Sequence, residues 1–518
     1  MKQILMSITF LTLGLSNQLI AQIVSIPDSI FKSKLLGFGI DTDFDNEISY
    51  QEAADVISLD LKAIDNPPPD YKYVDTIKTL KGIEAFINLE FLDCSYNKID
   101  TIDLIANKIL KNLKARNNEP LTCVKLNNNL LLEELELLVN YNLSSIDLSS
   151  QINLKRLDIS NTNISNPSLI SNINLETLLC EQYISSTINI SSLANLKTLD
   201  FTYSELTVLD ISNNNKLRSL ITNWSPLENI IVSENDSLID ISVNYGELKS
   251  LNLTGAPNVQ RVSCVLNNLS SLNVAGLQEL HTLNCGENEL GVLNVSNNTS
   301  LFYLTCENNK ITQLIFENND SLKYLYCNNN NLSNFELSNA PNIVYIECAN
   351  NLFSNLTVKH ATLKHFFISE NSQLNFLDIT YAQGIRNLQL NNMSQPIKVC
   401  VWELPFPPVD SIYIIVGDIG SPNITFENCL DATHEVFEQF IKVYPNPASE
   451  VLQIELNKGI ENEYNLFLYN SNGISVFEKK CDSTLNEINL AIESLPQGVY
   501  FLEISTKGHR YFKKVLIK

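Results

Sequence analysis

Histidine is scarce in this chain, and its scarcity limits the chemistry that the chain can carry. The 518 residues include five histidines, which fall in separate parts of the sequence: His281, His360, His365, His434 and His509. The motifs of serine hydrolases, zinc peptidases and phosphate-binding loops are also missing. The sequence therefore indicates no catalytic residues, and we expect a protein that is not an enzyme.

Positive charge is also in short supply. The chain has 35 Lys and Arg against 58 Asp and Glu, which gives a net charge of -23 and an isoelectric point of about 4.6. Lys and Arg form no long run. Because basic surfaces are what bind nucleic acid and anionic lipid, we expect neither as a partner.

No apolar run after the first residues reaches the ~18 residues of a membrane-spanning helix, so we expect no transmembrane segment. The first residues are different: Lys2 precedes an apolar stretch at 4–15 and a Leu-Ile-Ala ending at Ala21. This pattern predicts a signal peptide over residues 1–21. We therefore expect export through the periplasm to the outer cell surface or the medium, where conditions are oxidising.

What the chain has in abundance is a repeat. A cysteine recurs every 21 residues at Cys264, Cys285, Cys306, Cys327 and Cys348, and an asparagine follows each one three residues later. The apolar residue that opens each unit continues this frame from Leu89 to Ile385 in steps of 20 to 22 residues. A fixed period of this length is typical of a solenoid, here with about fifteen coils.

Each unit reads LxxLxCxxNxLxxLxLxxNxx, in which apolar and outward residues alternate as in a short strand. Stacked coils would form a parallel sheet over a continuous core, and the asparagine amide would bond the backbone of its own and the adjacent coil. Five central units lack this asparagine, and we expect looser turns there, or water in place of the amide. The units resemble the leucine-rich repeats of bacterial surface proteins over residues 81–396.

The repeat cysteines have more than one interpretation. A buried cysteine packs as a small apolar residue, and this is the interpretation that we favour. Cross-linking between coils and a metal ladder remain alternatives. Side chains on neighbouring parallel strands point the same way, which suits a disulfide poorly, and no CxxC pair or histidine cluster accompanies the cysteines.

Residues 22–80 precede the repeats as an N-terminal cap, and within them DTDFDNEISYQE (41–52) resembles an EF-hand or dockerin calcium loop. The resemblance implies six ligand positions: the carboxylates of Asp41, Asp43 and Asp45, the backbone carbonyl of Glu47, Ser49 directly or through a water, and the bidentate carboxylate of Glu52. Asn46 stands where this family prefers glycine. The expectation is a structural Ca²⁺ site, and the alternative is a polar loop whose acids are simply solvated.

Residues 397–430 follow the last repeat and contain Cys400 and Cys429, neither of which lies in the repeat frame. The open end of a solenoid exposes its core and must be covered. We therefore predict a disulfide between these two cysteines that closes a C-terminal cap, as in similar caps of exported leucine-rich repeat proteins.

A linker over 431–442 leads to residues 443–518, whose short alternating strands predict a small immunoglobulin-like β-sandwich. These residues resemble the type A C-terminal sorting domain of the type IX secretion system of Bacteroidetes. The motif residues that carry the resemblance are Tyr444, Pro445, Asn446, Pro447, Gly473, Gly498, Tyr500, Lys513 and Lys514. The resemblance implies that the type IX secretion machinery is a partner; a structural sandwich with incidental turn motifs is the alternative.

Aromatic residues recur on the outward side of the expected strands. The predicted ligand-binding face consists of Tyr303, Tyr324, Tyr326, Tyr345, His365 and Phe367, and Trp224 and Tyr245 suggest a second patch. Stacking between coils would explain these residues, as would a ligand. We expect a monomeric, mainly β protein with a leucine-rich repeat solenoid, whose function is non-catalytic protein binding or adhesion. Glycan binding and an accessory role in a surface enzyme complex are the alternatives.

Overall fold

The computed structural model describes residues 22–63, 75–334, 336–404, 406, 424–429, 441–456, 464–471, 473–481, 487–505 and 510–518. The expected signal peptide and most of the linker lie outside these residues. The chain divides into two compact units, Met1–Asn172 and Ile173–Lys518, which are described separately.

The first unit begins with two short helices, α1 (Ser29–Gly37) and α2 (Tyr50–Ala54). The Asp28 side chain caps α1 by accepting from the amides of Ile30 and Phe31. The first unit contributes one parallel row of strands: β1 (Ser58–Asp60), which precedes the 3₁₀ turn η1 (Ile83–Ala85), and then β2 (Phe91–Asp93), β4 (Asn112–Lys114), β6 (Glu134–Glu136) and β7 (Arg156–Asp158). A second pair, β3 (Thr101–Asp103) and β5 (Cys123–Lys125), forms a separate small sheet.

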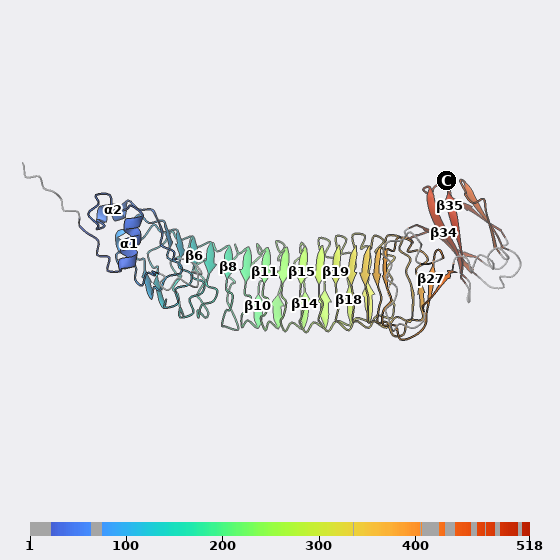
Figure 1. The fold of residues 1–518 in the computed structure, drawn as a ribbon, viewed down its shortest axis with the longest axis horizontal. Coiled ribbons are helices and arrows are strands. Elements are labelled where there is room, and N and C mark those ends of the chain that lie inside the picture. The colour runs from blue at the N-terminus through green and yellow to red at the C-terminus, as the bar shows by residue number, and fades with distance from the viewer. Residues whose placement is uncertain are drawn as a thin grey trace, which may run out of the picture. The chain divides into compact units, whose positions relative to one another are not determined.

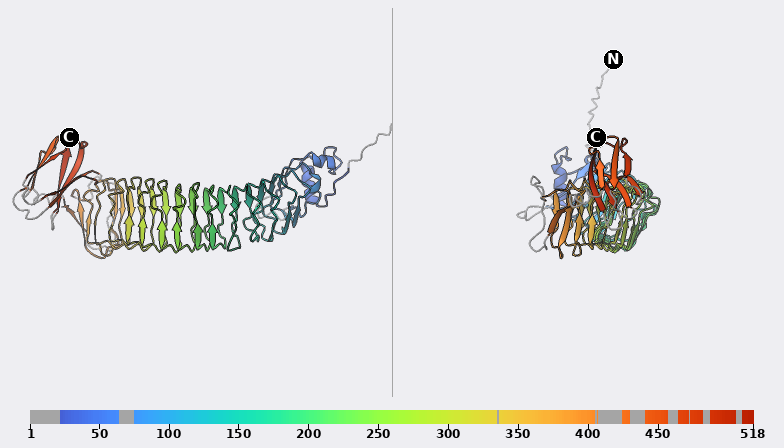
Figure 2. Two further views of the ribbon diagram at one scale, coloured as in Figure 1. Left: turned by 180° about the vertical axis from the view of Figure 1, so that it is seen from behind. Right: turned by 90° about the vertical axis from the view of Figure 1, so that its right-hand side faces the viewer.

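The second unit continues the repeats as a row of parallel strands (Figures 1 and 2). The row contains β8 (Thr177–Leu179), β9 (Thr198–Asp200), β11 (Ser219–Ile221), β13 (Asp240–Ser242), β15 (Arg261–Ser263), β17 (Thr282–Asn284), β19 (Tyr303–Thr305), β21 (Tyr324–Tyr326), β22 (Tyr345–Glu347), β24 (His365–Phe367) and β26 (Asn387–Gln389). In each of these strands the middle residue is buried while its neighbours face outward. The expected mainly β solenoid is confirmed.

The other half of the coils in this unit also carries short strands. Three parallel pairs are β10 (Val208–Asp210) with β12 (Asn229–Ile231), β14 (Ser250–Asn252) with β16 (Ser271–Asn273), and β18 (Val292–Asn294) with β20 (Gln313–Ile315). A further sheet contains β23 (Asn355–Thr357), β25 (Phe376–Asp378), β27 (Ile397–Val401) and β28 (Ile424–Asn428).

The asparagines work as predicted. The amide nitrogen of Asn309 donates to its own coil at Cys306 O (3.2 Å) and to the preceding coil at Cys285 O (3.0 Å), and its Oδ1 accepts from the Leu290 amide (3.0 Å). Asn288 and Asn330 make the same set of bonds. The side chain thereby satisfies backbone groups that a buried turn would otherwise leave unpaired.

The expectation of looser turns in the units without this asparagine is wrong. The residue before the asparagine position has φ 58° at Trp224, which lies in the region without the asparagine, and φ 54° at Asn308, which lies where it is present. The turn is kept because smaller groups fit the same space: the Ser204 and Ser225 hydroxyls bond each other at 2.9 Å. At Gly246, an added Cβ would lie 2.7 Å from the Oδ1 of Asn267.

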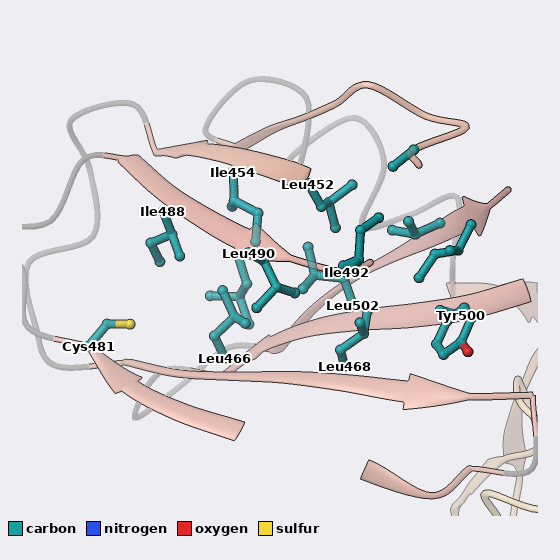
Figure 3. Packing of buried hydrophobic residues seen from close by; sticks show 14 of the residues in the cluster. Leu452, Ile454, Leu466, Leu468, Cys481, Ile488, Leu490, Ile492, Tyr500 and Leu502 are labelled. Carbon is teal, nitrogen blue, oxygen red and sulfur yellow. The ribbon is translucent and has the colours of Figure 1, made fainter. Parts of the chain in front are cut away.

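Two antiparallel sheets form the C-terminal sandwich. One contains β29 (Ile441–Tyr444), β30 (Val451–Leu456) and β33 (Glu487–Ala491), and the other β31 (Tyr464–Asn470), β32 (Ser475–Cys481), β34 (Gly498–Ser505) and β35 (Arg510–Ile517). Figure 3 shows the core between them, where Leu452, Leu490 and Leu502 are buried. The predicted small β-sandwich is confirmed.

Candidate functional site

The candidate ligand-binding face lies on the strand row of the second unit. Tyr303, Tyr324 and Tyr345 open three successive strands and pair in register, so their rings lie side by side. The ring centroids are 6.1 Å apart both between Tyr303 and Tyr324 and between Tyr324 and Tyr345, and His365 follows at 5.5 Å from Tyr345. The alternation of the strand turns all four side chains outward together.

A second row, two residues further along each strand, completes the surface. Tyr326 lies 5.1 Å from Tyr303 and 5.2 Å from Tyr345, and Phe367 lies 5.3 Å from Tyr345. All six predicted residues therefore come together, and we call this set, Tyr303, Tyr324, Tyr326, Tyr345, His365 and Phe367, the aromatic strip. Its rings are only partly exposed.

Glu347 belongs to the same surface, and the sequence analysis missed it. It occupies the second row between Tyr326 and Phe367. The Tyr345 phenol donates a hydrogen bond to its carboxylate, and the amide of Asn328 donates another at 2.9 Å. The signal that could have found it is its place in the row, since both neighbours in that row had been selected.

The surroundings of Tyr326, Tyr345 and His365 favour the uncharged forms of these three side chains. Burial, together with a hydrogen bond to Tyr303, raises the pKa of Tyr326 to about 12. Burial and then the hydrogen bond with Glu347 raise the pKa of Tyr345. Burial lowers the pKa of His365, and the nearby cations Lys364 and Arg386 lower it further.

Trp224 and Tyr245 do not lie on the strand face. They occupy turns, with φ of 58° and 59°, and stack on each other with ring centroids 3.7 Å apart. Tyr203, which the sequence analysis did not select, extends this stack at 5.9 Å from Trp224. These three rings form a separate exposed group at the turn edge, in the units that lack the asparagine.

The predicted calcium loop brings together three of its six residues. The carboxylates of Asp41, Asp43 and Asp45 have oxygens within 4.8 Å of one another. Asn46 takes the left-handed conformation, with φ 63°, that the family usually gives to glycine. Ile48 is buried, and its carbonyl accepts from the Val24 amide at 2.8 Å.

Two of the other predicted ligands, Ser49 and Glu52, are engaged elsewhere, and the side chain of Glu47, whose backbone carbonyl is the predicted ligand, is also paired. Glu52 accepts from the amides and hydroxyls of Thr42 and Ser49 at 2.6–2.9 Å. Burial alone would raise the pKa of Glu52, but these four bonds outweigh it and lower the pKa to about 2. Glu47 forms an ion pair with Lys32 at 2.6 Å. The carboxylate of Glu52 thus holds the start of α2, whose N-cap is Ser49.

The groups around Asp43 change the pKa of its carboxylate. The Asp45 amide donates to Asp43 and lowers its pKa, but loss of hydration and the neighbouring carboxylates of Asp45 and Glu52 outweigh that bond and raise the pKa. Carboxylates that repel one another in this way are the arrangement that a hard cation relieves.

The cysteines divide as predicted. Cys400 and Cys429 form a disulfide, whereas the five repeat cysteines are free and fully buried. The Cys285 thiol donates to the carbonyl of Thr305 in the next coil at 3.5 Å. Burial raises the pKa of Cys264 to about 12. The interpretation as packed core residues is confirmed, and the cross-linking alternative is wrong.

The sorting-motif residues hold the last strand of the sandwich. The Asn446 amide donates to Lys514 O at 2.9 Å, and its Oδ1 accepts from the Leu516 amide at 2.9 Å. The Tyr500 hydroxyl donates to Pro496 O at 2.8 Å. The remaining motif residues lie at the end of β29 (Tyr444), in the loop before β30 (Pro445 and Pro447), in the turn between β31 and β32 (Gly473, φ 76°), at the start of β34 (Gly498) and on β35 (Lys513).

Comparisons with known proteins agree with these observations. A family model described as a secretion system C-terminal sorting domain matches residues 442–518. The solved structure titled as the functional domain of InlJ from Listeria monocytogenes, which includes a cysteine ladder, matches with a TM-score of 0.51 and 18% identity over 96% of this chain and 98% of that chain. No curated protein matches the sequence.

Two further solved structures match with lower TM-scores. The Toll–Spatzle complex of Drosophila has a TM-score of 0.48 at 13% identity over 68% of this chain and 53% of that chain. The leucine-rich repeat domain of APL1B has a TM-score of 0.44 at 18% identity over 57% of this chain and 85% of that chain.

Among the described residues, no helix has the length and apolar character needed to cross a membrane. The chain is therefore an exported protein with a type IX secretion sorting domain at residues 442–518, preceded by a solenoid of the leucine-rich repeat type.

Proposed function

We propose that this protein is a non-catalytic adhesion module that binds another protein through the aromatic strip, either at the outer cell surface or after release. The observation that carries the proposal is the registered set of six partly exposed rings on one strand face. Large rings placed by a rigid scaffold offer contact area at a low cost in side-chain entropy, and such rings dominate protein interfaces.

The packing of the rings favours a protein ligand over a glycan. Tyr345 has four aromatic neighbours within 6.1 Å, so its ring is packed among other rings. The interplanar angles are 35–40°, so the rings do not form one flat surface. A sugar stacks on an open ring face, whereas protein side chains can fill the spaces between tilted edges.

The test compares the purified full chain with a variant in which Tyr303, Tyr324 and Tyr326 are replaced by serine. Binding to cells and to immobilised matrix proteins is measured on fluorescent beads, before and after protease treatment of the target surface. The matched control is Tyr203→Ser, which removes an exposed ring from the turn edge. We expect the triple variant, and protease treatment, to lower binding at least tenfold, while the control binds normally.

Two results would count against the proposal. The glycan alternative would be established if binding to cells survived protease treatment of the target surface and the wild type bound a glycan array that the triple variant did not bind. Equal binding by the triple variant and the wild type would show that the aromatic strip only stabilises the sheet.

We also propose that Asp41, Asp43 and Asp45 hold a structural Ca²⁺ that braces the N-terminal cap. The three carboxylates and the left-handed Asn46 support a hard-cation site. Glu52 would join the ion only by leaving its present hydrogen bonds, so the three aspartates are the ligands that this geometry offers.

A further inference from the structure

Glu347 is a partly buried carboxylate in the aromatic strip with neutral hydrogen-bond donors. Tyr345 and Asn328 donate to it, and within the described part of the chain no Lys, Arg or His forms an ion pair with it. Taking a carboxylate out of water is costly unless an opposite charge compensates it. The carboxylate is therefore positioned for a positive charge that the described residues do not supply.

One position of the same row in the first unit shows how such a carboxylate can be compensated by cations. In the first unit, Glu136 ends β6 as Glu347 ends β22. Glu136 contacts three cations: Arg116, Lys114 at 3.9 Å and Arg156 at 3.5 Å. The two positions differ in their surroundings: Tyr326 and His365 stand where the first unit has Lys114 and Arg156, and Asn328 stands where it has Arg116.

A second acid strengthens the negative side of the aromatic strip. Glu307 follows the core cysteine of its coil, as Asn328 and Ala349 do in the next two coils, so it lies along the edge where the strands end. No ion pair of Glu307 is found among the described residues either. The burial of both acids is intermediate, so a ligand can reach them.

The cations near the aromatic strip lie at its other edge. Lys323, Lys364 and Arg386 each precede the first strand residue of their coil, and Lys323 already lies over the Phe302 ring, 5.4 Å from its centroid. The strip therefore has a polarity, with acids where the strands end, cations where they begin and neutral rings between.

We propose that the partner on the aromatic strip is a basic protein segment, which places an Arg or Lys side chain against Glu347 beside the Tyr326 and Tyr345 rings. The inference rests on the proposed function, because it names the chemistry of the ligand for that same surface. A cation gains from both features: the carboxylate pairs with it, and the electron-rich rings attract it. Arg fits best because its planar guanidinium can stack on a ring while donating to the carboxylate.

The test uses the full chain and three fluorescent ten-residue peptides in which Arg, Glu or Gln alternates with Ser. Fluorescence anisotropy measures Kd at 50 mM and 300 mM salt. We expect the Arg peptide to bind most tightly and to weaken with salt. We further expect Glu347→Gln to raise its Kd by about tenfold and Tyr326→Leu by a similar factor.

The matched control is Glu205→Gln, which changes net charge by the same amount at an exposed acid outside the aromatic strip. We expect its Kd for the Arg peptide to equal that of the wild type. Equal weakening in Glu205→Gln and Glu347→Gln would attribute binding to the overall charge of -23 and overturn the inference. Circular dichroism spectra and melting curves of each variant show whether it is folded, and Glu347→Asp should restore part of the affinity.

The two proposals fail in different ways. If the serine triple variant loses cell-surface binding while Glu347→Gln keeps it, the ligand is a protein that does not use this charge; the inference is overturned and the proposed function stands. If neither variant changes cell-surface binding, both proposals are overturned.

Discussion

His360 makes the folding of the second unit sensitive to acid. Its ring is 4% exposed, and burial lowers its pKa to about 4 from an ordinary 6.5, although Glu336 and the Leu337 backbone oppose the shift. Among the residues that the structure describes, its Nδ1 atom has no hydrogen-bond partner. In two preceding coils a similar buried position is occupied by an asparagine, Asn298 or Asn319, whose amide donates to backbone carbonyls of the coil before it.

The size of the effect follows from these two pKa values. The folded state resists protonation of His360, so the unfolded chain binds more protons between pH 4 and 6.5. Its contribution to stability is therefore complete above pH 6.5 and is lost as the pH falls toward 4. From pH 8 to pH 5 the free energy of unfolding should fall by about 2 kcal/mol.

The assay is urea unfolding of the wild type and of His360→Asn at pH 8 and pH 5, followed by circular dichroism. Asparagine is neutral and matches the residue used in the earlier coils. The difference between the two proteins cancels the other titrating groups, among them buried Asp378, and should change by about 2 kcal/mol between the two pH values. An identical pH dependence of the two proteins would refute the reasoning.

Three further predictions concern other parts of the chain. Asn309→Ala should lower the free energy of unfolding by about 3 kcal/mol, because it leaves the Leu290 amide and nearby carbonyls unpaired. Ser204→Ala should lower it by about 1 kcal/mol, and urea unfolding measures both effects. Added Ca²⁺ should raise the melting temperature, and Asp43→Asn should abolish the rise; a chelator without effect on the wild type would contradict the calcium proposal. Deleting residues 443–518 should leave the protein in the periplasm, as cell fractionation would show, while normal surface display would contradict the role of the sorting domain.

The repeated parts of the fold could be predicted because the same pattern of apolar residues, cysteine and asparagine recurs in successive coils. A cysteine buried in one coil is buried in the next, and an asparagine that caps one turn caps its neighbour. Each coil is an independent indication of the same inward pattern. The disulfide of Cys400 and Cys429 was predictable for the opposite reason, since both residues depart from that pattern.

The unrepeated parts were harder to predict. Glu52 matched a ligand position in the loop, but the same residue also matches a capping box with Ser49, and the sequence cannot rank two partners for one carboxylate. The sequence analysis placed Trp224 and Tyr245 in a second patch on the strand face, which is wrong because both lie in turns. Their place one residue before the missing asparagine puts them in the left-handed turn position, which the spacing alone could have shown.

In each strand, packing restricts the inward residues far more than the outward residues, so a binding function is best sought on the outward face. The inward residues are fixed by packing against the coils on both sides, so the strands of the second unit vary little there. The outward residues face solvent, and parallel stacking asks only that neighbours do not repel one another. Three tyrosines in one outward row, followed by a histidine at the same place, therefore exceed what the fold requires. Glu347 adds a hydrogen-bonded acid to the same surface, and a cation brought by a ligand would compensate its charge.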